Sequence, residues 1–466
     1  MTYDPEDDGG LRIRGRSFMG ANLWIPKERV SNVHVLMRAC TFYKENNRTG
    51  QSEKINLAEL TEYHVVIPRY LLKVASSKDN PLQQAEAPDY QWERIDFGSK
   101  ITPRNPAQQK AWDALSEQDY GTLNLACGKG KTVMALHKIA QRGVPAIVIV
   151  PSVGLMEQWQ ERAVQFLNLT KDQIGIVQGK KAQWDKPLVI AMVHTLSARR
   201  DEVPLEARQR FGTVVFDEAH HMSAASFIRT ADLFHGARFG LTATPKREDG
   251  LEDVYFAHIG PIFYSDLVGE LSAEIFFRRI PTELTKQEKE RDILDKTGEF
   301  SVGKLYQVLA NKASRNKHLM DMVGQALGKG RKILVLVHAA VHPKILLDNF
   351  NQTELKNRYT ATAVSGTTKG PDRTRLMAEA DVTFATFGVA KEGLDVASLD
   401  TLVFATPFKA WGAFQQGKGR IERPTPNKKD PMVIVLDDTT IGPAAAMCNS
   451  LRRLIRANGY KYRNIG

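Results

Sequence analysis

The stretch from Leu125 to Thr132, LACGKGKT, combines glycines, a lysine and a hydroxyl residue at a spacing that suits nucleotide phosphates. The glycines let the backbone curl so that its N–H groups point at the β- and γ-phosphates. A helix is expected to begin at about Thr132 and to add the positive end of its dipole. Lys131 would then meet the phosphate charge, and Thr132 would hold Mg²⁺. Leu125 stands where the G-x-x-x-x-G-K-[ST] pattern begins with glycine, which is the least demanding glycine of the set. For this string alone, a strand-to-helix turn with a surface lysine is the alternative, because short motifs give false positives.

A second group, Asp217-Glu218-Ala219-His220, follows the apolar run Val214 to Phe216. Such a run is typical of a strand buried on both faces, and parallel sheets bind ligands at the carboxyl ends of their strands. Asp217 could hold Mg²⁺ through water, and Glu218 could accept the proton of an attacking water. Two acids that cap the next helix are the alternative for this motif alone. His220 and His221 predict no zinc site, because adjacent helical residues point in different directions.

Weaker motifs fit the same chemistry. Gln108 precedes the phosphate loop, and its amide could pair with both the donor and the acceptor edge of adenine. Arg420 and Arg423 share one helical face, and arginine suits the stabilisation of charge on a γ-phosphoryl group. A solvated basic face is the alternative for these arginines.

These residues must be positioned by the elements around them. Apolar, strand-like runs alternate with helical stretches along the chain, and this alternation predicts an α/β fold with parallel sheets. In the range 96–270, strands are expected at 122–126, 146–150, 174–177, 188–192, 213–216 and 239–242. A second series is expected in the range 313–466, with strands at 332–337, 359–364, 382–386, 401–404 and 433–436. The range 271–312 is expected to be a charged, helical bridging segment. Residues 1–95 predict a small α+β module with a basic, aromatic-bearing face, and residues 33–36 are expected to be a strand or turn. The alternative is that this module is an appendage that only packs against the rest of the chain.

Composition favours a globular protein with an acidic polymer as its partner. The formal net charge is +11 and the pI is near 9.3. Three cysteines without a C-x-x-C pair exclude a disulfide scaffold and a cysteine zinc site, and they suit a reducing compartment. No apolar run is long enough to span a membrane. The acidic first residues are unlike a signal peptide, so a cytoplasmic location is expected, the bacterial host cytoplasm if a phage encodes the chain.

Taken in order, these motifs resemble those of superfamily 2 helicases and translocases. The resemblance covers about residues 101–440 and rests on Pro106-Ala107-Gln108, Leu125 to Thr132, Val150-Pro151-Ser152 through Gln158-Trp159, Asp217 to His220, Thr242-Ala243-Thr244, Phe387 to Asp395 and Gln416 to Arg423. Arg247-Glu248-Asp249 directly after Thr-Ala-Thr resembles the R-E-D element of XPB-type repair helicases. The size and the small preceding domain are similar to bacteriophage helicases that remodel branched DNA.

This resemblance implies two tandem RecA-like lobes, a small N-terminal α+β domain, and ATP with Mg²⁺ in the cleft between the lobes. It implies catalytic roles for Lys131, Glu218, Gln416, Arg420 and Arg423. It implies nucleotide contacts from Gln108, Cys127, Gly128, Lys129, Gly130, Lys131, Thr132, Gly393 and Asp395, with Thr132 and Asp217 as metal ligands. By the same resemblance, Ser152, His194, Thr195, His338 and Thr386 would touch mainly DNA phosphates, and Arg247 would lie near the point of duplex separation.

The expected function is therefore an ATP-dependent DNA helicase that remodels forks and Holliday junctions. A duplex translocase that does not separate strands is the second hypothesis, and an RNA helicase is the third, because these motifs do not read the 2′-hydroxyl. From another class, the chain could be an ATP-gated clamp that binds DNA or a protein without moving. Multiple-turnover ATP hydrolysis would exclude the clamp.

Overall fold

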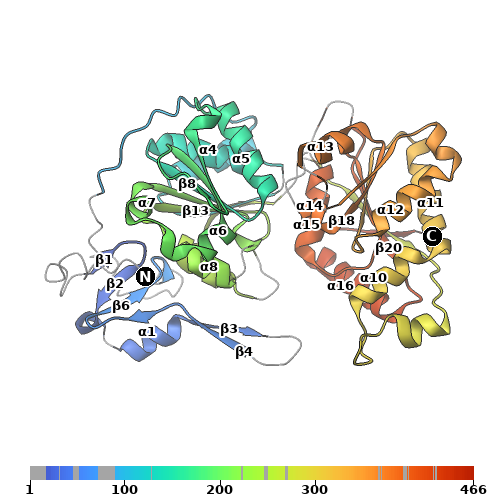
Figure 1. Cartoon of the computed structure of the whole chain (residues 1–466), viewed down its shortest axis with the longest axis horizontal. Coiled ribbons are helices and arrows are strands. Elements are labelled where there is room, and N and C mark those ends of the chain that lie inside the picture. Colours follow the sequence, from blue (N-terminus) through green and yellow to red (C-terminus); the bar gives the residue numbers. More distant parts are fainter. Residues whose placement is uncertain are drawn as a thin grey trace. The chain divides into compact units, whose positions relative to one another are not determined.

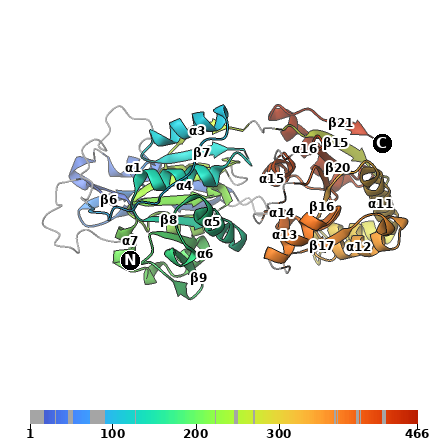
Figure 2. The ribbon, with the colours of Figure 1, turned by 90° about the horizontal axis from the view of Figure 1, so that it is seen from above.

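The computed structural model describes residues 17–465 except 31, 46–51, 72–89, 127, 222–223, 246–249, 268–270, 366–367, 369, 392–395, 397, 423–424 and 426–427. The chain divides into two compact units, Met1–Leu267 and Val268–Gly466. Each unit contains one large, predominantly parallel sheet with helices on both faces (Figures 1 and 2). This arrangement confirms the expected α/β class with two tandem lobes. No helix among the described residues is long and apolar enough to span a bilayer.

The large sheet of the first unit has the strand order β10-β9-β11-β8-β12-β13-β7-β14. Only β10 runs antiparallel to its neighbour. Central strands such as AIVIV and LVIAM are buried along their whole length, as expected for a sheet covered on both faces. The strands are β7 (Gly121–Leu125), β8 (Ala146–Val150), β9 (Ile174–Gln178), β10 (Lys181–Ala182), β11 (Leu188–Met192), β12 (Thr213–Asp217), β13 (Ala237–Thr242) and β14 (Ile262–Asp266).

Helices cover the two faces of this sheet separately (Figure 1). One apolar core lies between the sheet and α3 (Pro106–Ser116), α4 (Lys131–Arg142) and α5 (Val153–Phe166). The other lies between the opposite face and α6 (Val193–Ala198), α7 (Leu205–Arg210), α8 (Ala224–Ala231) and α9 (Glu252–Ile259). Helix α4 begins in the phosphate loop and ends at Gly143, whose φ of +57° gives a left-handed cap that favours glycine.

The N-terminal module belongs to the first unit, and its described residues form a four-stranded sheet in the order β1-β2-β6-β5, a two-stranded ribbon β3-β4 and the helix α1. Its core shares Ala257 of α9 with the parallel lobe, and the ribbon packs Phe42 and Ile55 toward Leu251 and Val254. The elements are β1 (Phe18–Met19), β2 (Leu23–Pro26), α1 (Val33–Ala39), β3 (Thr41–Glu45), β4 (Ser52–Asn56), β5 (Glu59–Leu60) and β6 (His64–Ile67).

The second unit has the strand order β17-β18-β16-β19-β20-β15-β21, with every pair parallel. Its strands are β15 (Glu274–Arg279), β16 (Ile333–Val337), β17 (Ala361–Val364), β18 (Val382–Thr386), β19 (Thr401–Phe404), β20 (Met432–Asp437) and β21 (Arg463–Ile465). Its helices are α10 (Val302–Asn311), α11 (Ala313–Gly328), α12 (His342–Asn351), α13 (Gly370–Glu379), α14 (Phe387–Lys391), α15 (Trp411–Ile421) and α16 (Gly442–Ala457). Helices α11 and α12 pack on one face and α13 to α16 on the other (Figure 2).

Two local expectations differ from the structure. Residues 33–36, expected as strand or turn because of their valines, form the start of α1, where the side chain of Asn32 accepts a hydrogen bond from the N–H of Val35 at 3.1 Å. The range 271–312, expected to be a helical bridge, opens with β15, which pairs with β20 and β21 inside the second sheet. Helix α10 and a short π-helical turn (Glu288–Asp292) follow in the same range.

Candidate functional site

The carboxyl edge of the first sheet gathers the residues that the sequence predicted for nucleotide binding. Strand β7 leads into the phosphate loop and α4, β12 ends at Asp217, and β13 ends at Thr242. These three strands are neighbours in the sheet, so their ends meet at one place. An open parallel sheet binds ligands at this edge.

The phosphate loop has the backbone conformation that its glycines permit. Gly128 and Gly130 both have φ of +84°, in the left-handed region. A side chain at Gly130 would also be obstructed, because a Cβ there would lie 2.7 Å from Nε2 of Gln108. The predicted helix start holds, since α4 begins at Lys131. Its first turn presents backbone N–H groups and the positive end of the helix dipole, which together favour an anion.

Gln108 contacts the phosphate loop directly. Its Nε2 donates to the carbonyl oxygen of Lys129 at 3.2 Å, and its Oε1 accepts from the N–H of Arg104 at 2.7 Å. The side chain is buried. In this conformation the amide braces the loop, and the predicted contact with adenine stays a prediction.

Lys131 and Glu218 face one another in the site. Lys131 Nζ lies 3.8 Å from Glu218 Oε1 and donates to the carbonyl oxygen of Leu125 at 3.3 Å. On its other side, Glu218 Oε2 lies 3.4 Å from Nδ1 of His220, and that ring nitrogen is 2.7 Å from Oγ1 of Thr242. A chain of polar contacts therefore runs from the phosphate loop through the acidic pair to the end of β13.

Asp217 is almost fully buried, with 3% of its surface exposed. Its Oδ2 accepts a hydrogen bond from the indole Nε1 of Trp159 at 2.7 Å, and its Oδ1 accepts from the N–H of Glu218 at 2.9 Å. Burial, followed by the negative charge of Glu218, raises the pKa of Asp217 to about 6. Carboxylate and hydroxyl oxygens are the hard donors that suit Mg²⁺, and Asp217 and Thr132, in the first turn of α4, offer one of each at this sheet edge.

A carboxylate that the sequence analysis did not single out also reaches the loop. Asp266, at the end of β14, forms an ion pair with Lys129. Both side chains are largely buried, and the N–H of Ala126 donates to the backbone carbonyl of Asp266 at 2.9 Å. The edge strand β14 therefore fixes one side of the phosphate loop.

The predicted nucleic-acid contacts of the first unit lie on the neighbouring half of the same sheet edge. Ser152 follows β8 and caps α5, accepting from the N–H of Leu155 at 3.4 Å. His194 and Thr195 follow β11, the next strand in the sheet. His194 is exposed, whereas Thr195 Oγ1 accepts from the N–H of Gly179 at 3.0 Å.

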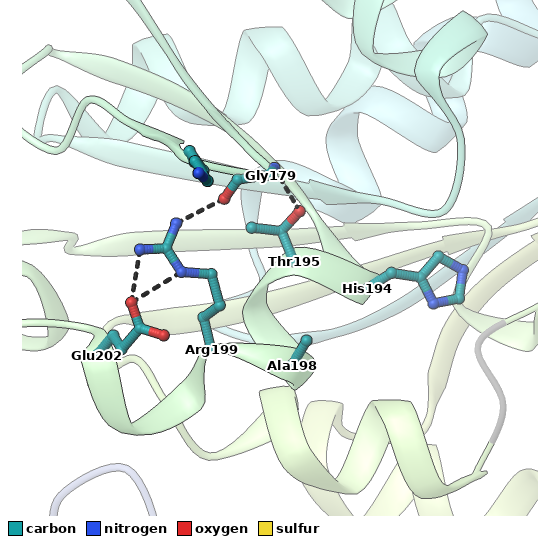
Figure 3. Close-up of a pocket in the computed structure, with 7 residues that line it drawn as sticks. Gly179, His194, Thr195, Ala198, Arg199 and Glu202 are labelled. Carbon is teal, nitrogen blue, oxygen red and sulfur yellow. Dashed lines mark hydrogen bonds and ion pairs between the residues drawn. The ribbon is translucent and has the colours of Figure 1, made fainter.

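His194 and Thr195 line an open surface pocket of about 680 Å³ (Figure 3). The side chain of Arg199 lies along this pocket, where Nη1 donates to the carbonyl oxygen of Gly179 at 2.6 Å and Nε donates to Oε2 of Glu202 at 2.8 Å. The pocket lining comprises Gly179, Lys180, His194, Thr195, Ala198, Arg199 and Glu202. A lysine, a histidine and a turn glycine at one hollow make a surface that can contact phosphates without reading bases.

In the second unit, α15 carries two of the predicted catalytic residues. Gln416 and Arg420 are four residues apart, so they share one face of the helix. On the opposite face, Lys418 forms a buried ion pair with Glu422 at 2.6 Å, and Lys418 Nζ lies 4.4 Å from the ring centre of Tyr460. Glu422 Oε1 also accepts from the N–H of Ala273 at 2.8 Å. This second face anchors the helix to the start of the unit.

His338, predicted to contact DNA, directly follows β16, and Thr386, predicted to do the same, is the last residue of the adjacent strand β18. The imidazole of His338 is stacked between Tyr306, with ring centres 4.1 Å apart, and Phe387, with ring centres 3.9 Å apart. Its Nδ1 lies 2.7 Å from Oγ1 of Thr406. Both faces of this ring are therefore covered by protein, which leaves its edge for any ligand.

Five predicted site residues lie outside the described residues, and their roles stay predictions: Cys127, Arg247, Gly393, Asp395 and Arg423. Among the described residues, no group of three or more His, Cys, Asp or Glu side chains could hold a metal ion.

Sequence reasoning missed Trp159 and Asp266 as site residues. Trp159 was noted only as part of a motif, and an apolar ring gives no sign that its N–H reaches a carboxylate from another element. Asp266 closes a strand that the sequence analysis did not assign. The turn at Gly179 was also missed, although its position directly after the predicted strand 174–177 could have revealed it.

Comparison with known proteins shows which proteins this chain resembles. Residues 88–247 match the family model described as "Type III restriction enzyme, res subunit". The chain is 31% identical over 189 residues to "DNA 3'-5' translocase XPB2" of Sulfurisphaera tokodaii, a match that covers 40% of this chain and 41% of that protein. It is 23% identical over 350 residues to a probable helicase of Escherichia phage T5, covering 74% of this chain and 73% of that protein.

The chain spans well under two thirds of the length of the first of these relatives. Among solved structures, it resembles Dbp5 of S. cerevisiae bound to RNA and ADP BeF3, with a TM-score of 0.55 and 14% identity over 79% of this chain and 89% of that one. That likeness shows the fold. The sequence matches show that the chain is similar to superfamily 2 helicases and translocases, among them XPB-type and phage proteins.

Proposed function

We propose that this chain hydrolyses ATP with Mg²⁺ to move on DNA, and that it remodels branched DNA such as forks and Holliday junctions. The observation that carries this proposal is the group of Lys131, Asp217 and Glu218 at one sheet edge. Lys131 lies 3.8 Å from Glu218, which is joined to the buried Asp217 through its own N–H. Phosphoryl transfer needs such positioned charges more than it needs covalent chemistry.

The residues have distinct roles in this mechanism. Thr132 and Asp217 would hold Mg²⁺, which supplies positive charge to the phosphates when bound. Lys131 and the N–H groups at the start of α4 hold the β- and γ-phosphates. Glu218 accepts the proton of the attacking water, and His220 keeps that carboxylate in place through the 3.4 Å contact. In the second unit, we assign Gln416 and Arg420 to the stabilisation of γ-phosphoryl charge.

DNA would be held mainly through its phosphates. Ser152 and the pocket residues Lys180 and His194 come after neighbouring strands of the first sheet, and His338 and Thr386 lie at the carboxyl ends of neighbouring strands of the second. Contacts of this kind ignore base sequence and weaken as salt rises, because binding releases counterions from the DNA. The net charge of +11 supports the same partner.

The test is ATP-dependent processing of a synthetic four-way DNA junction beside a linear duplex with a single-stranded tail, with Lys131→Ala as the blank. The proposal expects conversion of the junction at far lower protein concentration than the tailed duplex. Equal activity on both substrates would remove the preference for branched DNA. A matching RNA duplex, tested in parallel, would identify an RNA helicase if it were the substrate processed best.

A duplex translocase that does not separate strands is the second candidate. It is favoured by the match of residues 88–247 to a restriction-enzyme subunit and by a relative named as a translocase. Rapid DNA-stimulated ATP hydrolysis without product from either substrate would support it. Displacement of a triplex-forming strand from duplex DNA would then measure its movement.

A further inference from the structure

Trp159 occupies an unusual place for a core side chain. It lies in α5, is fully buried, and belongs to the apolar core between the sheet and α3, α4 and α5. Its indole N–H does not end in that core, because it donates to Oδ2 of Asp217 at 2.7 Å. An indole has only this one donor, and here it is directed at the carboxylate predicted to hold the metal.

The two hydrogen bonds of Asp217 fix its orientation. Trp159 holds Oδ2 and the N–H of Glu218 holds Oδ1, so the plane of the carboxylate is set by one donor on each oxygen. Each oxygen keeps further acceptor capacity for a cation or for a water on that cation. Without the indole, one buried oxygen would lose its donor, and the carboxylate could rotate about its terminal bond.

The helix that carries Trp159, α5, begins beside a predicted DNA contact. The helix begins after Ser152, on the half of the sheet edge predicted to contact DNA, and Trp159 lies two turns later. Strand β8, which precedes the helix, is the direct neighbour of β12, which ends at Asp217. The donor for the metal carboxylate is therefore supplied by the helix that starts at the predicted DNA contact.

We propose that Trp159 is a positioning residue for the metal site, which acts by holding the Asp217 carboxylate in the orientation that binds Mg²⁺. The inference rests on the proposed function, because it requires Asp217 to hold the metal. Partners that orient metal ligands typically change metal affinity by about 10- to 100-fold when they are removed.

The test measures metal binding and not only turnover. Mn²⁺ replaces Mg²⁺ as a paramagnetic probe, and its binding to the full chain is followed by electron paramagnetic resonance with a non-hydrolysable ATP analogue present. Trp159→Phe keeps an aromatic ring and removes the N–H. The expected result is a loss of Mn²⁺ affinity of about 10- to 100-fold, while affinity for the analogue in EDTA remains that of the wild type.

Trp92→Phe is the matched control, because Trp92 Nε1 also donates to an oxygen of the first unit, the carbonyl of Gln209 at 3.0 Å, away from the acidic pair. It should leave Mn²⁺ affinity unchanged. If Trp159→Phe does not fold, replacement of Trp159 by benzothienylalanine keeps the shape of the ring and lacks the donor. Wild-type Mn²⁺ affinity in a folded variant of either kind overturns the inference. Absence of Mn²⁺–nucleotide binding in the wild type overturns the proposed function instead.

Discussion

Glu218 is the one described non-glycine residue with a positive φ, +46°, and it comes directly after β12. A left-handed conformation costs a non-glycine residue about 1–2 kcal/mol, so surrounding contacts must hold it. Here the conformation turns the backbone sharply at the sheet edge. The N–H of Glu218 then donates to Asp217, and the carboxylate lies between Lys131 and His220. This backbone conformation lets the adjacent side chains of Asp217 and Glu218 point in different directions.

Glu218→Gln is the residue-scale prediction. The amide keeps the shape of the side chain but does not accept a proton from water, so ATP turnover should fall by about 10²- to 10⁴-fold. DNA binding should survive, because the predicted DNA contacts follow other strands. Steady-state ATP hydrolysis and fluorescence anisotropy of labelled DNA measure the two quantities. Retained turnover would contradict the role assigned to Glu218.

At the scale of elements, the strands with continuous apolar sequences were predictable almost to the residue. Strands β8 and β11 begin and end where their sequences indicate, because burial on both faces leaves no other stable place for such runs. Helix α1 was not predictable in this way. Its valines favour a strand, whereas the side chain of Asn32 caps a helix there.

The candidate site was predictable in part for the same physical reason. Residues at or just beyond the carboxyl ends of strands, such as Asp217 and Lys131, are brought together by the parallel sheet, and sequence motifs reveal them. Contacts made by a side chain within a core are set by packing. The indole of Trp159 and the carboxylate of Asp266 therefore needed the structure.

Helix α15 supplies a prediction at this scale. Lys418 and Glu422 form a buried ion pair, in which 6% of the surface of Lys418 and 7% of the surface of Glu422 is exposed. Breaking such a pair leaves one buried charge without its partner, so Lys418→Met alone should destabilise the second unit by about 3–5 kcal/mol. Adding Glu422→Gln removes the remaining charge, keeps an acceptor for the N–H of Ala273 and should restore most of that loss. Calorimetric unfolding of the two variants and the wild type measures the difference, and equal destabilisation by single and double variants would exclude this account.

The junction between the N-terminal module and the parallel lobe supplies another prediction. His258 and His235 are buried there. Burial, followed by the positive charge of Arg69 and Arg238, lowers the pKa of His235 to about 3. Burial also lowers the pKa of His258 to about 3, although the negative charge of Asp232 acts in the opposite direction. The stability that a neutral histidine contributes is complete above about pH 6.5 and falls as the pH drops, because the unfolded chain binds the proton more tightly.

Acidification from pH 7 to pH 5 should therefore destabilise the first unit by about 2 kcal/mol for each of these histidines. His258→Gln removes one titrating group and should reduce this acid sensitivity. His34→Gln, at an exposed position on α1, should not. Calorimetric unfolding at the two pH values distinguishes the variants. An acid response of His258→Gln equal to that of the wild type would show that other groups are responsible.

At the scale of the whole molecule, the N-terminal module is part of the first unit and not a detachable appendage. Arg238 of β13 is fully buried and donates to the carbonyl oxygens of Ala21 in the module and His258 in α9. Arg69 of the module donates to the carbonyl oxygen of Gly236 at 2.8 Å. Deletion of the module would leave these buried groups without partners, so point variants are the better probe of its role.

The outer face of the β3-β4 ribbon is the place for such variants. Tyr43 and Lys54 pair across the ribbon on the face opposite Phe42, and both are exposed. If the module engages branched DNA, Tyr43→Ala with Lys54→Ala should leave basal ATP hydrolysis unchanged and weaken junction processing. Lys27→Ala, elsewhere in the module, is the control. Unchanged junction processing by the ribbon variant would show that this face does not contact DNA.

The ion pair between Lys129 and Asp266 connects the phosphate loop to the end of the first unit. Asp266 is followed by Leu267, the last residue of the first unit, so the polypeptide leaves that unit directly beside the phosphate loop. If a nucleotide phosphate contacts Lys129, as the sequence predicts, its oxygens and Asp266 compete for the same ammonium group. Phosphate binding then weakens the hold of Lys129 on the end of β14, and loss of the ion pair raises the affinity of Lys129 for phosphate, because linkage is reciprocal. Nucleotide binding and the attachment of this end of the first unit are in that case thermodynamically coupled.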